Sequence, residues 1–551
     1  MSAARGWRVA SWLCVPIGAA VFARTLLAPF WQDDRVQRAM ALGGFPARRG
    51  VFDLYDFVRP GERDPFVQLG VLPWWTGDDF SMRFFRPIAS ALLFAEHRWL
   101  GSALAMHVLS LAWWAAAVLA AWGFFRRVVP ERAAAIATLI FAIAPCHEPA
   151  LSMLAQREVL IVLAFGIGAL GLVLPGGEPS RLRSIGAGFL FAMALGAGEY
   201  GLCLGGYVLA HVLWSSEPTP PRLRRALPFA VPAAIYLVTR AMLGYGATGA
   251  GFYRDPLHDP RAFLLHAPRA LSTLVVDAWS TLDAERLPLW ALLAIFAVLA
   301  AVLLRATPAG SLRWLVGGSF LALIPLTASA PSQRLIGPAL VGIAPALGTL
   351  LDGAMETPRR ALVTVAAIAA AALHLIHAPI ASFEAAGASL RYARRLEQRA
   401  AFLGEQASPG VSAGIVGLAS WETAFFTSIQ AEPITYERMR WHVLVTAHHA
   451  LMLRTGDRTI DVVVPKGQGF FPVGADDIFR SEDSPFHSGD QRDVPGMHVL
   501  IVSDGTTDAP RMRFTFDRAA EDPTLLWCTE HRSGLEVIAP PQRGFGVQLS
   551  P

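Results

Sequence analysis

The chain has 551 residues, of which 54% are hydrophobic and only 16% are charged, and its mean hydropathy is +0.42. These values lie outside the range of soluble globular proteins and predict an integral membrane protein with room for a further domain. The net charge of +4 forms no clustered basic stripe, which excludes a nucleic-acid-binding function. The four cysteines are scattered and indicate buried small side chains rather than a disulfide framework or a metal site.

Ten apolar segments follow one another before residue 380. They lie near 9–28, 103–124, 133–146, 158–174, 185–214, 226–244, 288–304, 314–330, 335–351 and 361–378. Several approach the roughly 20 residues that a spanning helix needs, so the sequence predicts about ten or eleven spans. The first segment lacks a clear cleavage site and continues to Phe30, so we expect a retained helix rather than a signal peptide.

Segment 185–214 is too long for one span and short for two, and Glu199 lies in its glycine-rich middle, "LGAGEYGLCLGG". Basic loops at both ends favour a short hairpin. Irregular backbone at membrane depth is tolerated where it is buried in protein or lines a cavity. We therefore expect Glu199 to face polar groups.

The orientation in the membrane follows from short arginine-rich loops, which favour the cytoplasmic side. These loops are "FFRRVVPER" at 124–132, "PSRLRS" at 179–184, "PPRLRR" at 220–225, "RATPAGSLR" at 305–313 and "TPRR" at 357–360. All fall on one side if the N-terminus is cytoplasmic. The long loop 31–100 and the chain after about residue 380 are then extracytoplasmic, and the protein is a multi-pass protein of the plasma (inner) membrane.

The character of the chain changes near residue 405. Segment 381–404 has the pattern of an amphipathic connecting helix, possible at a membrane surface. After it come short β-type runs between Gly, Pro and Asp turns, such as "RTIDVVVP" and "MHVLIVSDG". The predicted fold is thus mainly α, a polytopic helix bundle over 1–380, followed by the connecting helix 381–404 and a mostly β extracytoplasmic domain over 405–551.

Two adjacent carboxylates, Asp33 and Asp34, follow the aromatic pair Phe30 and Trp31 at the outer end of the first helix. A carboxylate pair at a helix end is often only a solvated face. Just outside the bilayer, however, one carboxylate can act as a general base on a hydroxyl, or hold a divalent cation against a phosphate. A divalent cation is the one cofactor that the sequence leaves open.

Basic side chains interrupt two further apolar stretches. Arg86 interrupts the stretch 84–101, and "APCHEPALSMLAQREVL" carries His147 near its start and Arg157 near its end. A zinc site would need more nitrogen or sulfur ligands at regular spacing. An arginine and a histidine that face the same lumen as the aspartates suit the phosphate of a lipid.

These pieces in this order resemble the multi-span GT-C glycosyltransferases. The series is the outward Asp-Asp, "FRPIASALLFAEHRWLG", "CHEPALSMLAQREVL", "LGAGEYGL", "RALPFAVPAAIYLVTRAMLG" and "APSQRLIGPALVGIAPALG". It covers roughly residues 10 to 400 and most resembles the O-mannosyltransferase-like branch, whose members often end in tetratricopeptide repeats. Here a β-type domain stands in place of the repeats.

The resemblance implies an enzyme that moves a sugar from a polyprenyl-phosphate carrier to a protein, lipid or glycan acceptor at the outer membrane face, with inversion. It implies that Asp33 is the catalytic base, with Asp34 beside it. The substrate-binding residues that we expect are Arg86, His147, Arg157, Glu199, Arg240 and Arg334. For Arg240 and Arg334 the alternative is that the side chain only snorkels to the interface. The family's first His-Pro and its lysine are replaced by Ala144-Pro145 and Gly198.

Two other functions stay open from the sequence. A transporter or flippase of a lipid-linked saccharide would share the cavity and its arginines, and a non-catalytic scaffold would only present the C-terminal domain. An enzyme requires that Asp33, Asp34, His147 and Arg157 converge on one outward cavity, whereas a scaffold does not.

Overall fold

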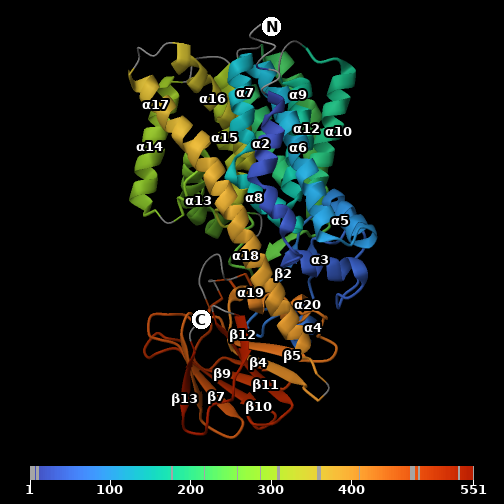
Figure 1. The fold of residues 1–551 in the computed structure, drawn as a ribbon, viewed down its shortest axis with the longest axis vertical. Helices are drawn as coiled ribbons and strands as arrows, with labels where there is room; N and C mark the ends of the chain where they lie inside the picture. Colours follow the sequence, from blue (N-terminus) through green and yellow to red (C-terminus); the bar gives the residue numbers. More distant parts are fainter. Residues whose placement is uncertain are drawn as a thin grey trace.

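The computed structural model describes residue 7 and residues 11–549, with gaps at 175–177, 216–217, 257–258, 286, 307–310, 357–360, 409, 472–477, 482–483 and 532–533. A helical bundle makes up one end of the elongated molecule and a β-rich domain the other, joined by one long helix (Figure 1). The arginine-rich loop 357–360 lies outside the described residues, as does part of the loop 305–313.

The bundle is made of helices, which include the predicted apolar segments. They are α2 (Cys14–Val21), η1 (Ala23–Leu27), α6 (Ala103–Val128), α7 (Glu131–Ala142), η2 (Pro145–His147), α8 (Glu148–Ser152), η3 (Leu154–Gln156), α9 (Glu158–Val173), α10 (Arg181–Ala197), α11 (Tyr200–Trp214), α12 (Thr219–Met242), α13 (Pro260–Ser280), α14 (Leu289–Ala306), α15 (Ser311–Leu323), η4 (Pro325–Ala328), η5 (Gln333–Ile336), α16 (Gly337–Glu356), α17 (Ala361–Ala371) and the π-helix η6 (Ala372–His377). Large apolar side chains such as Phe189 and Ile235 stay exposed on the bundle surface, as expected where lipid replaces water.

Four helical segments of the described chain are long and apolar enough to cross a membrane: 103–128, 154–173, 333–356 and 363–405. The pair 131–142 and 145–152, bent by 45°, makes a fifth if it is one span. The protein is thus an integral membrane protein. Fewer helices pass this length test than the ten or eleven spans predicted, because apolar helices such as α11 are shorter than a full span.

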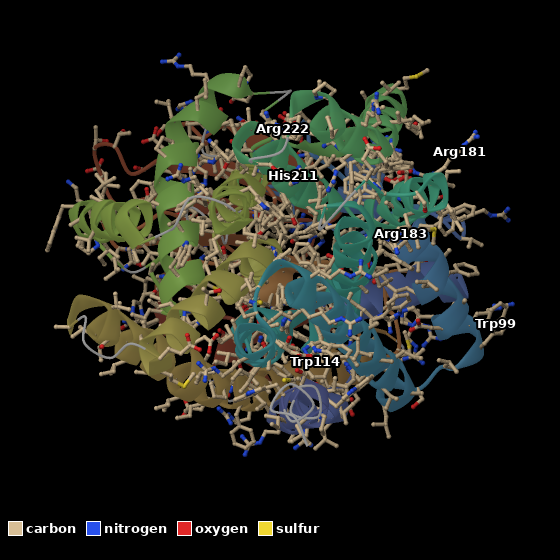
Figure 2. All side chains as sticks on the ribbon, turned by 90° about the horizontal axis from the view of Figure 1, so that it is seen from above. Trp99, Trp114, Arg181, Arg183, His211 and Arg222 are labelled. Carbon is tan, nitrogen blue, oxygen red and sulfur yellow. The ribbon has the colours of Figure 1, made fainter. Side chains whose placement is uncertain are left out.

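The expected break in segment 185–214 is confirmed. Helix α10 ends at Ala197 and α11 begins at Tyr200, so Gly198 and Glu199 lie between two helices. The loops at the far ends of this hairpin meet, because the Arg224 guanidinium lies 3.6 Å from the Glu178 carboxylate. Figure 2 looks onto this end of the bundle, opposite to the C-terminal domain, and labels Arg181, Arg183 and Arg222.

The loop 31–100 is folded rather than extended. It contains α3 (Asp33–Leu42), β1 (Asp56–Val58), α4 (Arg63–Gln68), β2 (Ser81–Arg83) and α5 (Pro87–Trp99). Strand β2 pairs with β1 and with β3 (Gly246–Thr248), which ties the loop to the segment after α12.

Helix α18 (Ala378–Glu405) contains the predicted connecting segment 381–404. It continues the helix of residues 363–377 without a break and runs from the bundle into the β-rich domain (Figure 1). The segment therefore extends away from the bundle instead of lying flat on a membrane surface.

The C-terminal domain is built on two sheets, as the alternating β-type runs predict. Its elements are β4 (Ala413–Leu418), α19 (Trp421–Ala424), α20 (Thr427–Gln430), β5 (Arg440–Val445), β6 (Ala450–Arg454), β7 (Thr459–Val463), β8 (Gln491–Val494), β9 (Met497–Ser503), β10 (Arg511–Phe516), β11 (Leu525–His531), β12 (Gly534–Val537) and β13 (Gly546–Leu549). One sheet has the order β13-β6-β7-β10-β9-β8, and the other has the order β12-β11-β4-β5, in which β4 runs parallel to both neighbours.

The loop 31–100 and the C-terminal domain share one hydrophobic core. The Trp75 ring stacks on Phe471 at a centroid distance of 4.4 Å, and the Trp74 ring meets Phe514 edge-on at 5.8 Å. The backbone N–H of Gly77 donates to the Phe479 carbonyl at 2.7 Å. The two parts of the chain are therefore one folded unit, although more than 300 residues separate them.

The predicted sidedness can be tested by cysteine labelling, since all four native cysteines are buried and free. Gln68, Glu178 and Ser408 are exposed, and each can be changed to cysteine. In intact spheroplasts, a membrane-impermeant maleimide should label Gln68→Cys and Ser408→Cys, whereas Glu178→Cys should react only after permeabilisation. The opposite pattern would contradict the predicted orientation.

Candidate active site

Helix α3 carries the two aspartates at the end of the bundle that faces the C-terminal domain (Figure 1). Asp33 and Asp34 occupy its first turn, where carboxylates interact favourably with the helix dipole, and Gly43 ends it with a φ of 84°. The preceding Trp31 donates its indole N–H to the Ser152 carbonyl at 2.8 Å and packs edge-on against Tyr392 of α18. The aromatic residue before the aspartates thus anchors the start of α3 to the bundle.

The two carboxylates have different surroundings. Asp34 is fully buried, and its Oδ1 accepts a hydrogen bond from the Ala155 backbone N–H at 2.8 Å, so it attaches α3 to the segment before α9. Asp33 is partly exposed and receives no hydrogen bond from the described residues. Burial raises the pKa of Asp33 to about 6, against the opposing charges of Arg334 and Arg86. Burial also raises the pKa of Asp34, to about 7, but only Asp33 is partly exposed, so Asp33 is the one of the two carboxylates that a substrate can reach.

Arg86 lies at the centre of an ion-pair network beside Asp33. Its Nε and Nη2 donate to the two Glu199 carboxylate oxygens at 2.9 and 2.8 Å, and its Nη1 donates to Glu158 Oε1 at 3.0 Å. Two carboxylates thus hold the guanidinium in a fixed orientation. Gly198 makes room for this network, because a Cβ there would lie 3.3 Å from Glu158 Cγ.

Arg334 differs from Arg86 because it has no hydrogen bond or ion pair with any residue in the described part of the chain. It is half-buried, and its Cζ lies 5.6 Å from the centroid of the Phe252 ring. Its charge acts on Asp33, Tyr200 and Tyr253. A half-buried guanidinium without an anionic partner is well suited to bind an anion from outside the chain.

Arg157 and His147 do not join this cluster. The Arg157 side chain is only 1% exposed, pairs with Glu96 and donates to the Met106 carbonyl at 3.0 Å. His147 is buried between aromatic rings, with Nε2 2.8 Å from the Phe141 carbonyl oxygen. Among the described residues, both side chains are thus occupied by contacts inside the bundle.

Arg240 lies at the edge of the cluster. Its Nη2 is 3.1 Å from Asp255 Oδ2, and its charge still acts on Glu199. Asp33, Arg86, Glu199 and Arg334 therefore converge at one end of the bundle, whereas Asp34, His147 and Arg157 make other contacts.

Two further members of the cluster, Glu158 and Tyr55, were not predicted from the sequence. Glu158 follows Arg157 directly, so the two side chains leave the helix in different directions, and Glu158 turns toward Arg86. The Tyr55 ring lies 4.9 Å from the Arg86 guanidinium, and its hydroxyl donates to the Ala155 carbonyl at 2.8 Å. No group of three His, Cys, Asp or Glu side chains in the described chain could hold a metal ion.

No family model and no curated protein matches the chain. Among solved structures, it is similar to an Archaeoglobus fulgidus oligosaccharyltransferase tethered to an acceptor peptide with the NVT sequon (15% identity, 79% of this chain, 63% of that chain, TM-score 0.39). It is also similar to ArnT from Cupriavidus metallidurans bound to undecaprenyl phosphate (14% identity, 80% of this chain, 86% of that chain, TM-score 0.42). The chain spans less than two thirds of the matched archaeal oligosaccharyltransferase. Likenesses of this size define neither its family nor its activity.

Proposed function

We propose that the protein is a membrane glycosyltransferase of the GT-C type that moves a sugar from a polyprenyl-phosphate carrier to an acceptor at the outer membrane face. One observation carries the proposal. A carboxylate with a pKa near neutrality, Asp33, lies within the electrostatic reach of Arg334, a cation without an ionic partner in the described chain. Transfer from a lipid phosphate needs this pair of groups, a base for the acceptor and a cation for the leaving phosphate.

In the proposed reaction, Asp33 accepts the proton of the acceptor hydroxyl while the hydroxyl oxygen bonds to the anomeric carbon. The bond from that carbon to the carrier phosphate oxygen breaks, and its electron pair leaves with the phosphate. Arg334 pairs the charge that develops on this oxygen. Attack opposite to the leaving group inverts the anomeric centre. Arg86 keeps Glu158 and Glu199 paired, which limits their repulsion of the phosphate.

A transfer assay tests the proposal against the transporter and scaffold alternatives. The purified protein in lipid nanodiscs is given a polyprenyl phosphate that carries a radiolabelled sugar, together with membrane and envelope extracts as acceptors. An enzyme releases polyprenyl phosphate and moves the label to a new species. A transporter or scaffold leaves the labelled donor intact, and that result across several donor sugars would contradict the proposal.

The rate of transfer should depend on pH in the acid range. Asp33 must be a carboxylate to accept a proton, and its pKa is raised to about 6. The activity is therefore present above pH 6 and lost as the pH falls, by about tenfold per unit once the pH is well below the pKa. Measurement of kcat/KM across the acid range checks this, with Asp33→Glu expected to move the midpoint. A flat profile would show that another group is the base.

A further inference from the structure

A second cationic site lies next to Arg334 and shares one aromatic ring, Phe252, with it. It is a cavity of about 160 Å³ that is lined in part by Phe252, Arg254, His266 and Arg269. The Arg334 guanidinium also lies over the Phe252 ring, so this ring is a wall that the two sites share.

Backbone hydrogen bonds hold this wall in place. The Arg254 N–H donates to the Ala328 carbonyl at 2.8 Å, and the Ala330 N–H donates to the Phe252 carbonyl at 3.2 Å. The segment with Phe252 and Arg254 is thus joined to the chain just before Arg334. The cavity is therefore built on the same framework as the candidate active site.

The charge of the cavity is predominantly positive. Arg254 and Arg269 lie close enough to His266 for both charges to act on it, and neither guanidinium has an ion pair or side-chain hydrogen bond within the described residues. Glu285 is the one carboxylate on the wall, and it takes part in a further interaction. Thr273 adds a hydroxyl donor. Two guanidiniums and a hydroxyl around a small volume match the shape and charge of a phosphate group.

The surroundings indicate that this phosphate belongs to a lipid. Leu264 and Leu265, just before His266 on α13, are 67% and 75% exposed. In an integral membrane protein, exposed leucines contact lipid chains, and a cationic cavity beside them is positioned to bind an anionic head group of the same lipid.

We infer that this cavity binds a lipid-borne phosphate, in addition to the carrier phosphate that we assign to Arg334. That phosphate comes either from a second phosphate on the carrier, which rests on the proposed function, or from the head group of a bilayer phospholipid. The cavity is not required to touch the sugar in either case.

Binding measurements with three probes test the inference and separate the two sources. Farnesyl phosphate, farnesyl diphosphate and phosphatidylglycerol are titrated against the purified protein in a neutral detergent. The variants are Arg254→Ala and Arg269→Ala. The control is Arg261→Ala, which removes an exposed arginine of α13 that does not line the cavity.

If the carrier supplies the phosphate, the wild-type protein binds farnesyl diphosphate more tightly than farnesyl phosphate. Arg254→Ala and Arg269→Ala then bind the diphosphate at least about tenfold more weakly than the wild-type protein does, but still bind the monophosphate. If a phospholipid supplies it, the two farnesyl probes bind alike and the variants bind phosphatidylglycerol at least about tenfold more weakly. The inference would be overturned if Arg254→Ala and Arg269→Ala bound all three probes with the same affinities as Arg261→Ala. Binding of farnesyl phosphate shows that each variant is folded. If the transfer assay failed, the proposed function would fall, but a result with phosphatidylglycerol would still support the phosphate site.

Discussion

Replacing Asp33 by asparagine is expected to lower the rate of sugar transfer by about 10²- to 10⁴-fold, the usual contribution of a general base. The amide keeps the size of the side chain but cannot accept the acceptor's proton. The polyprenyl-phosphate transfer assay measures the effect. Because Arg334 is unchanged in this variant, binding of farnesyl phosphate should stay close to that of the wild-type protein.

Asp64→Asn is the matched control for Asp33→Asn. Asp64 is an exposed carboxylate of the same outer loop, paired with its neighbour Arg63. Its loss should leave the transfer rate unchanged. Near-normal turnover in Asp33→Asn would mean that the base lies elsewhere or that the protein performs no such reaction.

Truncation of Arg157 to alanine is expected to destabilise the protein by about 3 to 5 kcal/mol, because it leaves a buried carboxylate unpaired. Glu96 is buried, and its ionic partner in the structure is Arg157. This expectation differs from the one drawn from the sequence, in which Arg157 is a substrate-binding residue. Thermal unfolding in detergent checks this, because the midpoint temperature of Arg157→Ala should be lower than that of the wild-type protein.

Two further variants make the Arg157 test specific. Arg98→Ala removes an exposed arginine of the same outer region and should change the stability by no more than about 0.5 kcal/mol. The double variant Arg157→Met with Glu96→Gln removes both charges and should recover much of the lost stability. If Arg157→Ala unfolds like the wild-type protein and binds farnesyl phosphate more weakly, Arg157 belongs to the phosphate site after all.

The periodicity and composition of the chain predicted the helical bundle, the break at Glu199 and the β-rich C-terminal domain. They did not predict α13, because Arg261, His266 and Arg269 interrupt its apolar run. Nor did they predict that α18 continues the last bundle helix, since an amphipathic pattern is the same whether the helix lies on a membrane or between two domains.

The candidate site was predictable in part. Asp33, Arg86 and Glu199 were named through the resemblance to the GT-C glycosyltransferases, and Arg334 was named because charged groups at the ends of apolar segments are rare. The partner of Arg157 was not, because Glu96 is 61 positions away and only the packing of α5 against the bundle brings it near. For the same reason, no local pattern indicated that Asp34 would bind the Ala155 backbone.

The shared core of the outer loop and the C-terminal domain has a consequence for the order of synthesis. The loop leaves the ribosome early, but Trp74 and Trp75 find Phe514 and Phe471 only after most of the chain has been made. At about 5 to 20 residues per second, the loop waits on the order of tens of seconds with these aromatic rings uncovered. Helix α3 and Asp33 belong to that loop, so a chain that stops before the C-terminal domain is made lacks the core against which this loop packs. Packing of the loop that carries the candidate site is in this way delayed until translation is nearly finished.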